Sequence, residues 1–447
     1  MKSCSIWRQS PQHRGSGPSR QGYSLAVSRP SSADPRVSGS PAAGREGVIL
    51  FTLAALQFVS VVDFMIVMPL GPQLLAALGI DAREFSWVVS AYTLAAGLAG
   101  FLAAPVLDRV GRKAAYLTLS IGLLVATAAC GLATSYPLLL AARCATGAFG
   151  GVHGGLSLAM VADVFPEHRR GRATATLMLA FAVASVVGVP IGIVLGTRFG
   201  WQMPFLALAA LGLPLVAMAA WTIPPLAGHV GDSTRHPVAQ LVDTLTIPAH
   251  RRAFALIAML MFGAFAVIPY ISTAFVANVG VTESQLPVIF IAGGLLTLVS
   301  TPLVGRLVDR YGPLRVFRWV VPLSAAMILV MTHLPAVGLA GAAPVTAVLM
   351  ATNAGRMVTA MSLITASIEP RRRGGFMSAN ASVQHIASGL GTMCGGLIVQ
   401  GGAGEPLRHF GTVGILAATT TLASLWLAGR VARREVNDVW LPPPQGR

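Results

Sequence analysis

Charged residues are scarce in this chain of 447 residues. Asp, Glu, Lys and Arg together make up 11% of the sequence, whereas 54% of the residues are hydrophobic. The mean hydropathy is +0.69. Because soluble domains carry charges on about 25% of their residues, this composition excludes an ordinary soluble domain and indicates an integral membrane protein.

Cysteines are also few, and their positions show no paired spacing. The chain has four, at positions 4, 130, 144 and 394, and the last three lie inside apolar segments. We expect these three to behave as small apolar side chains, and we expect neither a disulfide framework nor a metal site.

Motifs for catalysis and for nucleotide binding are missing. The sequence contains no HExxH, no GxSxG, no phosphate-binding loop and no pair of acids within an apolar segment. A membrane-embedded enzyme is therefore disfavoured, no cofactor is expected, and ion gradients rather than ATP are the expected source of energy. A receptor that does not transport is a further alternative, although no motif favours it.

Long apolar runs, by contrast, are abundant. A spanning helix needs about 20 mostly apolar residues, and twelve such segments can be placed between the charge clusters. They predict an all-α membrane protein with spans at 48–72, 85–107, 114–134, 137–160, 173–197, 203–223, 253–278, 286–307, 315–333, 338–366, 375–400 and 411–430.

Basic residues outnumber acids, and they fall on one side of the predicted spans. Of the 32 Lys and Arg residues, 27 lie in the two tails and in the loops of one side. The opposite loops hold Arg83, Arg198 and Arg408, and two arginines lie inside spans. By the positive-inside rule this asymmetry puts both termini in the cytoplasm. The excess of basic residues therefore indicates the topology of the chain and contact with anionic lipid headgroups, and it does not indicate binding of nucleic acid.

The chain divides into five predicted regions. Residues 1–47 are rich in Ser, Pro, Gly and Arg, lack the apolar core of a secretory signal, and are predicted to be a disordered cytoplasmic tail. Six spans follow in residues 48–223, a polar linker in 224–252 and six more spans in 253–430. Residues 431–447 form the second predicted cytoplasmic tail.

The two sets of six spans share sequence anchors. The residues DRVG at 108–111 recur as DRYG at 309–312, an offset of 201 positions. The RG pair at 170–171 has a counterpart at 373–374, in the corresponding loop of the second half. Two anchors indicate a duplicated six-helix unit and thus two pseudo-symmetric bundles, as is typical of secondary transporters.

These repeated loops resemble those of the major facilitator superfamily. The family pattern is a Gly, a Leu two residues later, then Asp-Arg-x-Gly-Arg-Lys; this chain has Ala104 and Val106 at the first two places. The matching residues are Asp108, Arg109, Gly111, Arg112 and Lys113 in the first copy and Gly305, Leu307, Asp309, Arg310 and Gly312 in the second. The resemblance implies a latch between bundles at the cytoplasmic face; ordinary topology-fixing charges are the alternative.

Two further segments resemble proton-coupled members of this superfamily. In span 4, Arg143 and Gly147 stand where those members carry Arg and Gly, with Thr146 in place of the usual Gln. In span 5, the Gly- and Pro-rich stretch of Gly188, Pro190 and Gly192 resembles the motif of drug/proton antiporters, although its spacing differs. The alternative for Arg143 is a salt bridge that only fixes helix packing. The alternative for the span 5 stretch is close helix packing alone.

Polar side chains within spans identify a candidate cavity, because lipid offers them no partner. Asp63 is the one acid predicted near the centre of a span, and "PLGP" beyond it, with Pro69 and Pro72, is expected to end that span. His153 and His385 are expected to be hydrogen-bonded structural residues. The predicted cavity residues are Gln57, Ser60, Tyr92, Asn353, Arg356, Asn380, Gln384 and Ser388.

The resemblance implies a proton-coupled exporter of small drug- or sugar-like molecules in the bacterial inner membrane. Asp63 would alternate between charged and neutral beside Arg143, and protons and substrate would bias the two bundles between two packings. The alternative is a symporter that imports a sugar or an organic anion, with Arg143 and Arg356 binding the anion together. Protons, a small-molecule substrate and the bilayer are the expected partners of a monomer.

Overall fold

The computed structural model describes residues 43–107, 110–225, 237–369 and 373–437. These residues belong to one unit, Pro41–Arg447. Their regular secondary structure is helical, apart from an isolated β-bridge between Gln400 and Arg408. The predicted tail lies outside the described residues except for its last five positions, and Asp108 and Arg109 of the first loop motif also lie outside them.

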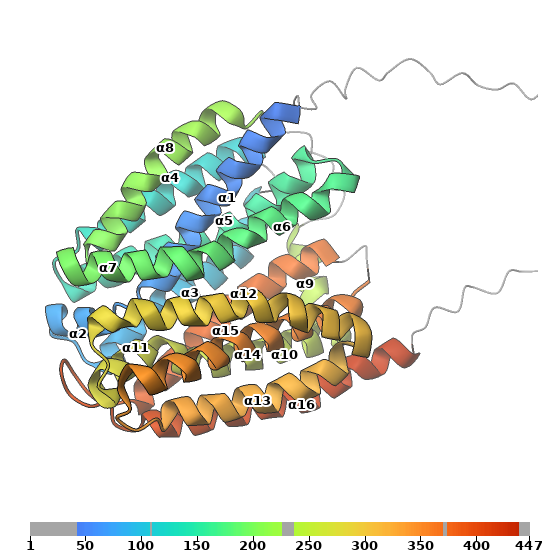
Figure 1. Ribbon diagram of the computed structural model, residues 1–447. Helices are drawn as coiled ribbons and strands as arrows, with labels where there is room; N and C mark the ends of the chain where they lie inside the picture. Colours follow the sequence, from blue (N-terminus) through green and yellow to red (C-terminus); the bar gives the residue numbers. More distant parts are fainter. Residues whose placement is uncertain (1–42, 108–109, 226–236, 370–372, 438–447) are drawn as a thin grey trace, which may run out of the picture. The chain divides into compact units, whose positions relative to one another are not determined.

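The first half of the chain forms eight α-helices and one π-turn (Figure 1). Their bounds are α1 Ala43–Ile66, α2 Gly71–Leu78, α3 Ala82–Leu107, α4 Arg112–Gly131, α5 Tyr136–Val164, α6 Glu167–Val183, η2 Ala184–Gly188, α7 Val189–Phe199 and α8 Met203–Thr222.

The second half repeats this pattern after a short helix in the predicted linker. The elements are α9 Pro237–Thr246, α10 Pro248–Val267, η3 Ile268–Tyr270, α11 Ile271–Ala274, η4 Phe275–Val279, η5 Glu283–Gln285, α12 Leu286–Tyr311, α13 Pro313–Thr332, α14 Gly338–Ala366, α15 Arg373–Ile398 and α16 Phe410–Asn437. The last helix therefore continues into the predicted C-terminal tail.

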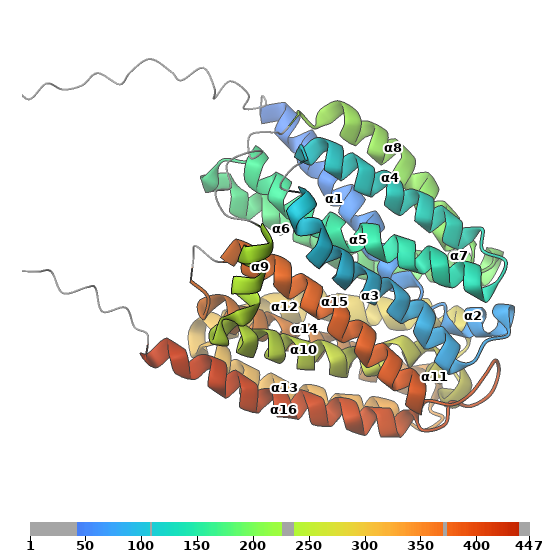
Figure 2. The ribbon, with the colours of Figure 1, turned by 180° about the vertical axis from the view of Figure 1, so that it is seen from behind.

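All twelve predicted spans have a helical counterpart in the described residues, which confirms the all-α membrane architecture. Eleven of these helical segments are long and apolar enough to cross a membrane by themselves. The remaining one, α15, is too polar to meet that criterion. It packs between α3 and α10, as Figure 2 also shows, so its polar side chains are shielded from lipid.

The end of α1 differs from the prediction. The predicted span runs to residue 72, but α1 ends at Ile66, so Asp63 lies in its last turn. Pro69 has no N–H and disfavours the helical conformation at Met68, which explains a stop before this position. Pro72 does not end a helix; it lies in the first turn of α2, where its missing N–H has no cost.

Span 5 and span 7 are interrupted helices. In span 5 a π-turn, Ala184–Gly188, separates α6 from α7 just before Pro190. Since Pro190 cannot donate a backbone hydrogen bond, local widening of the helix at this point has a direct cause. In span 7, η3 contains Pro269 and a second π-turn follows at Phe275–Val279.

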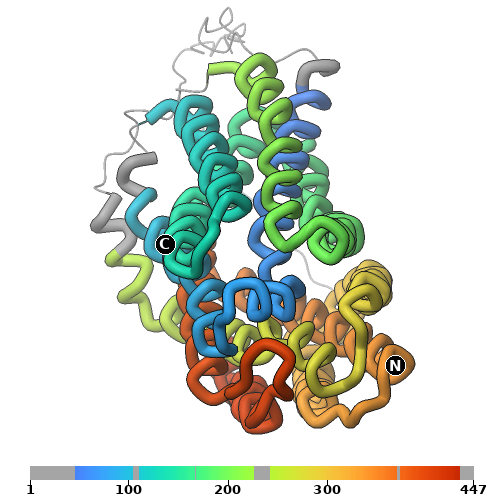
Figure 3. Tube along the Cα trace, turned by 90° about the vertical axis from the view of Figure 1, so that its left-hand side faces the viewer, coloured from blue at the N-terminus to red at the C-terminus, as the bar shows by residue number. Residues whose placement is uncertain are grey.

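The two halves meet through α3 against α15 and through α7 and η2 against α12. Glycines permit this close approach: a Cβ built at Gly97 would lie 2.9 Å from the carbonyl oxygen of Ser382, and one at Gly294 would lie 2.7 Å from a side-chain carbon of Val186. Figure 3 shows the helices end-on, with those of the first half in blue and green and those of the second in yellow to red.

One end of the helices carries most of the arginines. We call it the basic side; it is where α1 begins and α16 ends (Figure 1). At the opposite side the halves are joined by a hydrogen bond from the Ala82 amide to the Gly401 carbonyl, 3.0 Å long. Phe85 and Tyr270 also meet there, with ring centroids 6.4 Å apart. The two halves are therefore in direct contact at the end away from the basic side.

Candidate functional site

A buried ion pair lies in the core of the first half. The exposed fraction is 0% for Asp63 on α1 and 1% for Arg143 on α5, and 3.2 Å separates Arg143 Nη1 from Asp63 Oδ2. The same Nη1 donates to the Asp63 backbone carbonyl at 3.3 Å. The hydroxyl of Thr127, on α4, donates to Asp63 Oδ1 at 3.1 Å. Three helices thus hold the carboxylate, and charge and hydrogen bonds compensate for the burial of both ions.

One aromatic ring contacts the cationic end of this pair. The Arg143 guanidinium lies 4.6 Å from the ring centroid of Tyr92 on α3, a cation–π contact. Ser60 on α1 lies close to the Tyr92 hydroxyl. Four helices of the first half therefore position the charged groups. Two of the predicted cavity residues, Ser60 and Tyr92, belong to this cluster.

Phe64 connects the cluster to the second half of the chain. Its ring lies 5.1 Å from that of Tyr92 and 6.0 Å from that of Phe265 on α10. The ring of His385, on α15, meets Phe64 edge-on at 6.3 Å. Phe64 follows Asp63 directly in the sequence, so the residue next to the acid contacts two helices of the other half, α10 and α15.

Close packing of α3 against α5 depends on Gly147. A Cβ at this position would lie 2.1 Å from the Tyr92 carbonyl oxygen, whereas one at Gly155, on the same helix, would meet nothing within 4 Å. We expect Gly147→Ala to push the two helices apart and to destabilise the protein by about 1–3 kcal/mol, the usual cost of overpacking. Gly155→Ala is the matched control. Thermal unfolding of the purified proteins measures the difference, and equal melting temperatures would contradict the prediction.

Arg356 occupies the core of the second half without a carboxylate. Its side chain is 2% exposed, and Nη1 donates to the Thr421 hydroxyl at 2.9 Å. Between residues 253 and 430 the chain has four acids, and each lies in a loop or near the end of a helix: Glu283, Asp309, Glu369 and Glu405. None of them forms an ion pair with Arg356 among the described residues. Arg143 and Arg356 therefore lie in different environments, one neutralised and one not.

The remaining predicted cavity residues are buried or half-buried. Asn353 and Asn380 each have a buried side-chain oxygen without a hydrogen-bond partner in the described part of the chain, and so does Gln57. Ser388 instead donates to the carbonyl of Gln384, one turn earlier on α15, at 2.8 Å. The described residues thus leave these three buried acceptors without a hydrogen-bond donor.

His153 differs from its predicted role. His153 is fully buried, yet neither ring nitrogen has a hydrogen-bond partner among the described residues. Its ring lies 4.7 Å from that of Tyr116 on α4. The predicted hydrogen bond of His153 is thus not found, and the observed contact is a tilted pair of rings. His385 is half-buried and makes the ring contact with Phe64.

The first loop motif makes an ion pair within its own half. Arg112, at the start of α4, pairs with Asp163 near the end of α5. In the second copy, Arg310 lies over the ring of Tyr311 at 5.3 Å, and Asp309 is exposed. Gly312 has φ +82°, a conformation that favours glycine and turns the chain into α13. Lys113 and Gly305 make no contact that joins the halves in the described residues, so the latch remains a prediction.

Three contributors to the site were missed from the sequence. Thr127 is a polar residue inside a predicted span, the signal that identified the other cavity residues. Phe64 and Phe265 carry no such signal, because aromatic residues in spans usually serve general packing. Their role follows from contacts between helices that are far apart in the sequence.

The sequence model of the Major Facilitator Superfamily matches residues 53–392 and, in a second match, residues 253–446. The chain belongs to this superfamily. The second match begins close to the start of α10, in agreement with the repeated loop motifs. This membership makes the chain a multi-pass membrane transporter and not an enzyme.

Curated relatives cover most of the chain at low identity. An uncharacterised transporter of this type, YceJ of Bacillus subtilis, is 25% identical over 381 residues, which are 85% of this chain and 95% of YceJ. The inner membrane transport protein YdhP of Escherichia coli is 24% identical, covering 83% of this chain and 93% of YdhP. A chloramphenicol resistance protein of Streptomyces lividans is 25% identical over 56% of this chain and 65% of its own length.

Solved structures show the same fold. A bacterial homologue of the human lysosomal transporter Spinster, in an inward-facing and occupied conformation, superposes with a TM-score of 0.68, 14% identity, and coverage of 90% of this chain and 100% of that one. The human organic anion transporter MFSD10 gives a TM-score of 0.64 at 15% identity, covering 86% and 99%. At these identities the likeness establishes the fold alone.

Proposed function

We propose that this transporter is a proton-coupled antiporter that exports small organic molecules. The observation that carries the proposal is the Asp63–Arg143 pair. A carboxylate that is fully buried among helices is costly unless it is paired, and ionisable groups at such places mark ion or proton pathways. Resemblance to drug efflux proteins supports export, and the chloramphenicol resistance protein among the relatives points the same way.

In the proposed cycle the proton binds to Asp63. Protonation removes the negative charge and weakens the ion pair, so the Arg143 guanidinium is left with Tyr92 and the Asp63 carbonyl. In the proposed cycle α1 then shifts, and the shift acts on the second half through Phe64, which contacts α10 and α15. The proton thereby changes the relative stability of the two packings of the bundles.

The orientation of the chain completes the proposal. We place the basic side at the cytoplasmic face of a bacterial inner membrane, because 27 of the 32 Lys and Arg residues lie in the tails and in the loops of that side. In this orientation the Ala82–Gly401 and Phe85–Tyr270 contacts between the halves lie on the periplasmic side.

A transport assay with inverted membrane vesicles tests this function. With an acidic interior, inverted vesicles should accumulate the exported compound, and a protonophore should abolish the accumulation. A panel of drugs and sugars identifies the compound, beginning with chloramphenicol. Accumulation only in right-side-out vesicles would contradict export.

A second function is favoured by Arg356. A buried cation that forms no ion pair among the described residues is suited to pairing with an anionic substrate, so a symporter that imports an organic anion is the alternative. Arg143 is already paired with Asp63, which leaves Arg356 as the cation for this role. Uptake of organic anions by right-side-out vesicles under an inward proton gradient distinguishes this alternative from export.

A further inference from the structure

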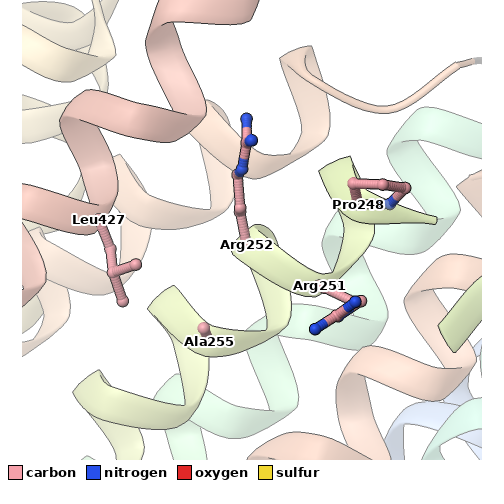
Figure 4. Close-up of a pocket in the computed structure, with 5 residues that line it drawn as sticks. All are labelled: Pro248, Arg251, Arg252, Ala255 and Leu427. Carbon is pink, nitrogen blue, oxygen red and sulfur yellow. The ribbon is translucent and has the colours of Figure 1, made fainter. Parts of the chain in front are cut away.

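Two pockets flank α16 near its basic end. The first has a volume of about 510 Å³ and is lined by Pro248, Arg251, Arg252 and Ala255 of α10 and by Leu427 of α16 (Figure 4). The second, of about 270 Å³, is lined by Arg318 of α13 and by Leu425, Trp426, Gly429 and Arg430 of α16. Each pocket therefore combines two arginines with apolar side chains.

The arginines of both pockets are exposed and have no ion pair with an acid among the residues that the structure describes. None of the ion pairs among the described residues includes Arg251, Arg252, Arg318 or Arg430. In Figure 4 the side chains of Arg251 and Arg252 leave α10 in different directions, so they supply positive charge on two sides of its first turns. An anion in the first pocket would not compete with an internal carboxylate.

Each pocket has a second feature that favours an anion at this depth. Pro248 is at the start of α10, where the positive end of the helix dipole attracts negative charge. In the second pocket the Arg430 guanidinium lies 3.6 Å from the ring centroid of Trp426, whose side chain is 60% exposed. An exposed tryptophan is typical of the membrane interface, and stacking on it orients the arginine before a ligand binds.

The apolar lining identifies the kind of anion. Ala255 and Leu427 continue the first pocket along α10 and α16 towards the apolar part of the helices, and Leu425 does so in the second. A free phosphate would use the arginines alone. A phospholipid would place its phosphate at the arginines and its acyl chains along these apolar residues.

We propose that both pockets bind the headgroups of anionic phospholipids in the leaflet on the basic side, which is the cytoplasmic leaflet in the proposed orientation. The binding does not depend on the direction or coupling of transport. Basic pockets between spanning helices on the cytoplasmic side are suited to such headgroups. A zwitterionic lipid would gain less, because its own ammonium group competes with the arginines for the phosphate.

Native mass spectrometry of the purified full-length protein tests the proposal with phosphatidylglycerol and phosphatidylcholine as probes. We expect the wild type to retain phosphatidylglycerol selectively. Arg251→Gln with Arg252→Gln should weaken binding at the first pocket by about thirtyfold, since each arginine near an anionic surface contributes about 1 kcal/mol. Arg318→Gln with Arg430→Gln should have the same effect at the second pocket.

The matched control is Arg306→Gln with Arg315→Gln. These arginines are exposed near the basic ends of α12 and α13, line neither pocket, and change the net charge equally. Loss of phosphatidylglycerol from this control to the same degree would overturn the proposal, because attraction would then depend only on net charge. Displacement of the lipid by millimolar inorganic phosphate would also overturn it.

Gly429→Leu provides a test without a change of charge. A Cβ at Gly429 would meet nothing within 4 Å, so the substitution fills the second pocket and leaves helix packing intact. We expect the variant to melt like the wild type and to lose the phosphatidylglycerol bound there. Unchanged lipid retention with an unchanged melting temperature would contradict a site in this pocket.

Discussion

Asp63→Asn is expected to reduce proton-driven accumulation in proteoliposomes to the level of protein-free liposomes. Asparagine has nearly the shape of aspartate but cannot take up a proton and release it again. Arg143 keeps its contacts with the backbone carbonyl of residue 63 and with the Tyr92 ring, so we expect the variant to fold. Accumulation of the transported compound under an imposed pH gradient measures the effect.

Substrate exchange without a gradient separates loss of coupling from loss of transport. We expect Asp63→Asn to catalyse exchange of labelled for unlabelled substrate across the membrane, because exchange needs only binding and the change between two packings. The exposed Asp243 on α9 provides the control substitution Asp243→Asn, which should leave both activities unchanged. Retained uphill transport by the Asp63 variant would remove this residue from proton coupling.

Arg143→Gln is expected to have the largest effect on stability. It leaves the Asp63 carboxylate fully buried with the Thr127 hydroxyl as its remaining side-chain donor. Removing one partner of a buried ion pair costs about 3–5 kcal/mol, chiefly because the other charge stays buried without compensation. Thermal unfolding in detergent should therefore show a melting temperature several degrees below that of the wild type.

The double variant Asp63→Asn, Arg143→Gln tests the cause of that loss. With both charges removed, two neutral side chains of similar volume occupy the site, and most of the stability should return. If the double variant is less stable by the sum of the two single effects, the residues do not interact and the ion-pair explanation is wrong. Neither stability result depends on the direction of transport.

Much of the fold was predictable because the membrane limits the possibilities. A segment in lipid must satisfy its backbone hydrogen bonds internally, so an apolar run of sufficient length predicts a helix. The twelve spans and the duplicated half follow from this rule and from the repeated DRxG loops. The end of α1 was placed too late, at residue 72 rather than Ile66, because Pro69 and Pro72 were assigned the same role.

The candidate site was predictable only where a side chain is costly in lipid. Asp63, Arg143, Tyr92 and Arg356 were identified because charged or polar groups in spans need partners. The pairing itself was a weaker inference, since Asp63 and Arg143 are 80 positions apart in the sequence. Thr127 was not among the predicted cavity residues, although it is a polar residue inside a predicted span and donates to Asp63.

The sequence by itself determined which segments cross the membrane, which side is basic, and which ionisable groups lie inside. Periodicity and charge fix the faces of a single helix, but they do not specify which faces of different helices meet. Only the tertiary structure decided that Arg143 pairs with Asp63 while Arg356 forms no ion pair in the described part of the chain. It also decided that Arg112 pairs within its own half and that Phe64, beside the ion pair, contacts α10 and α15. These contacts depend on how all the helices pack together, and the distance between residues along the sequence does not reveal that packing.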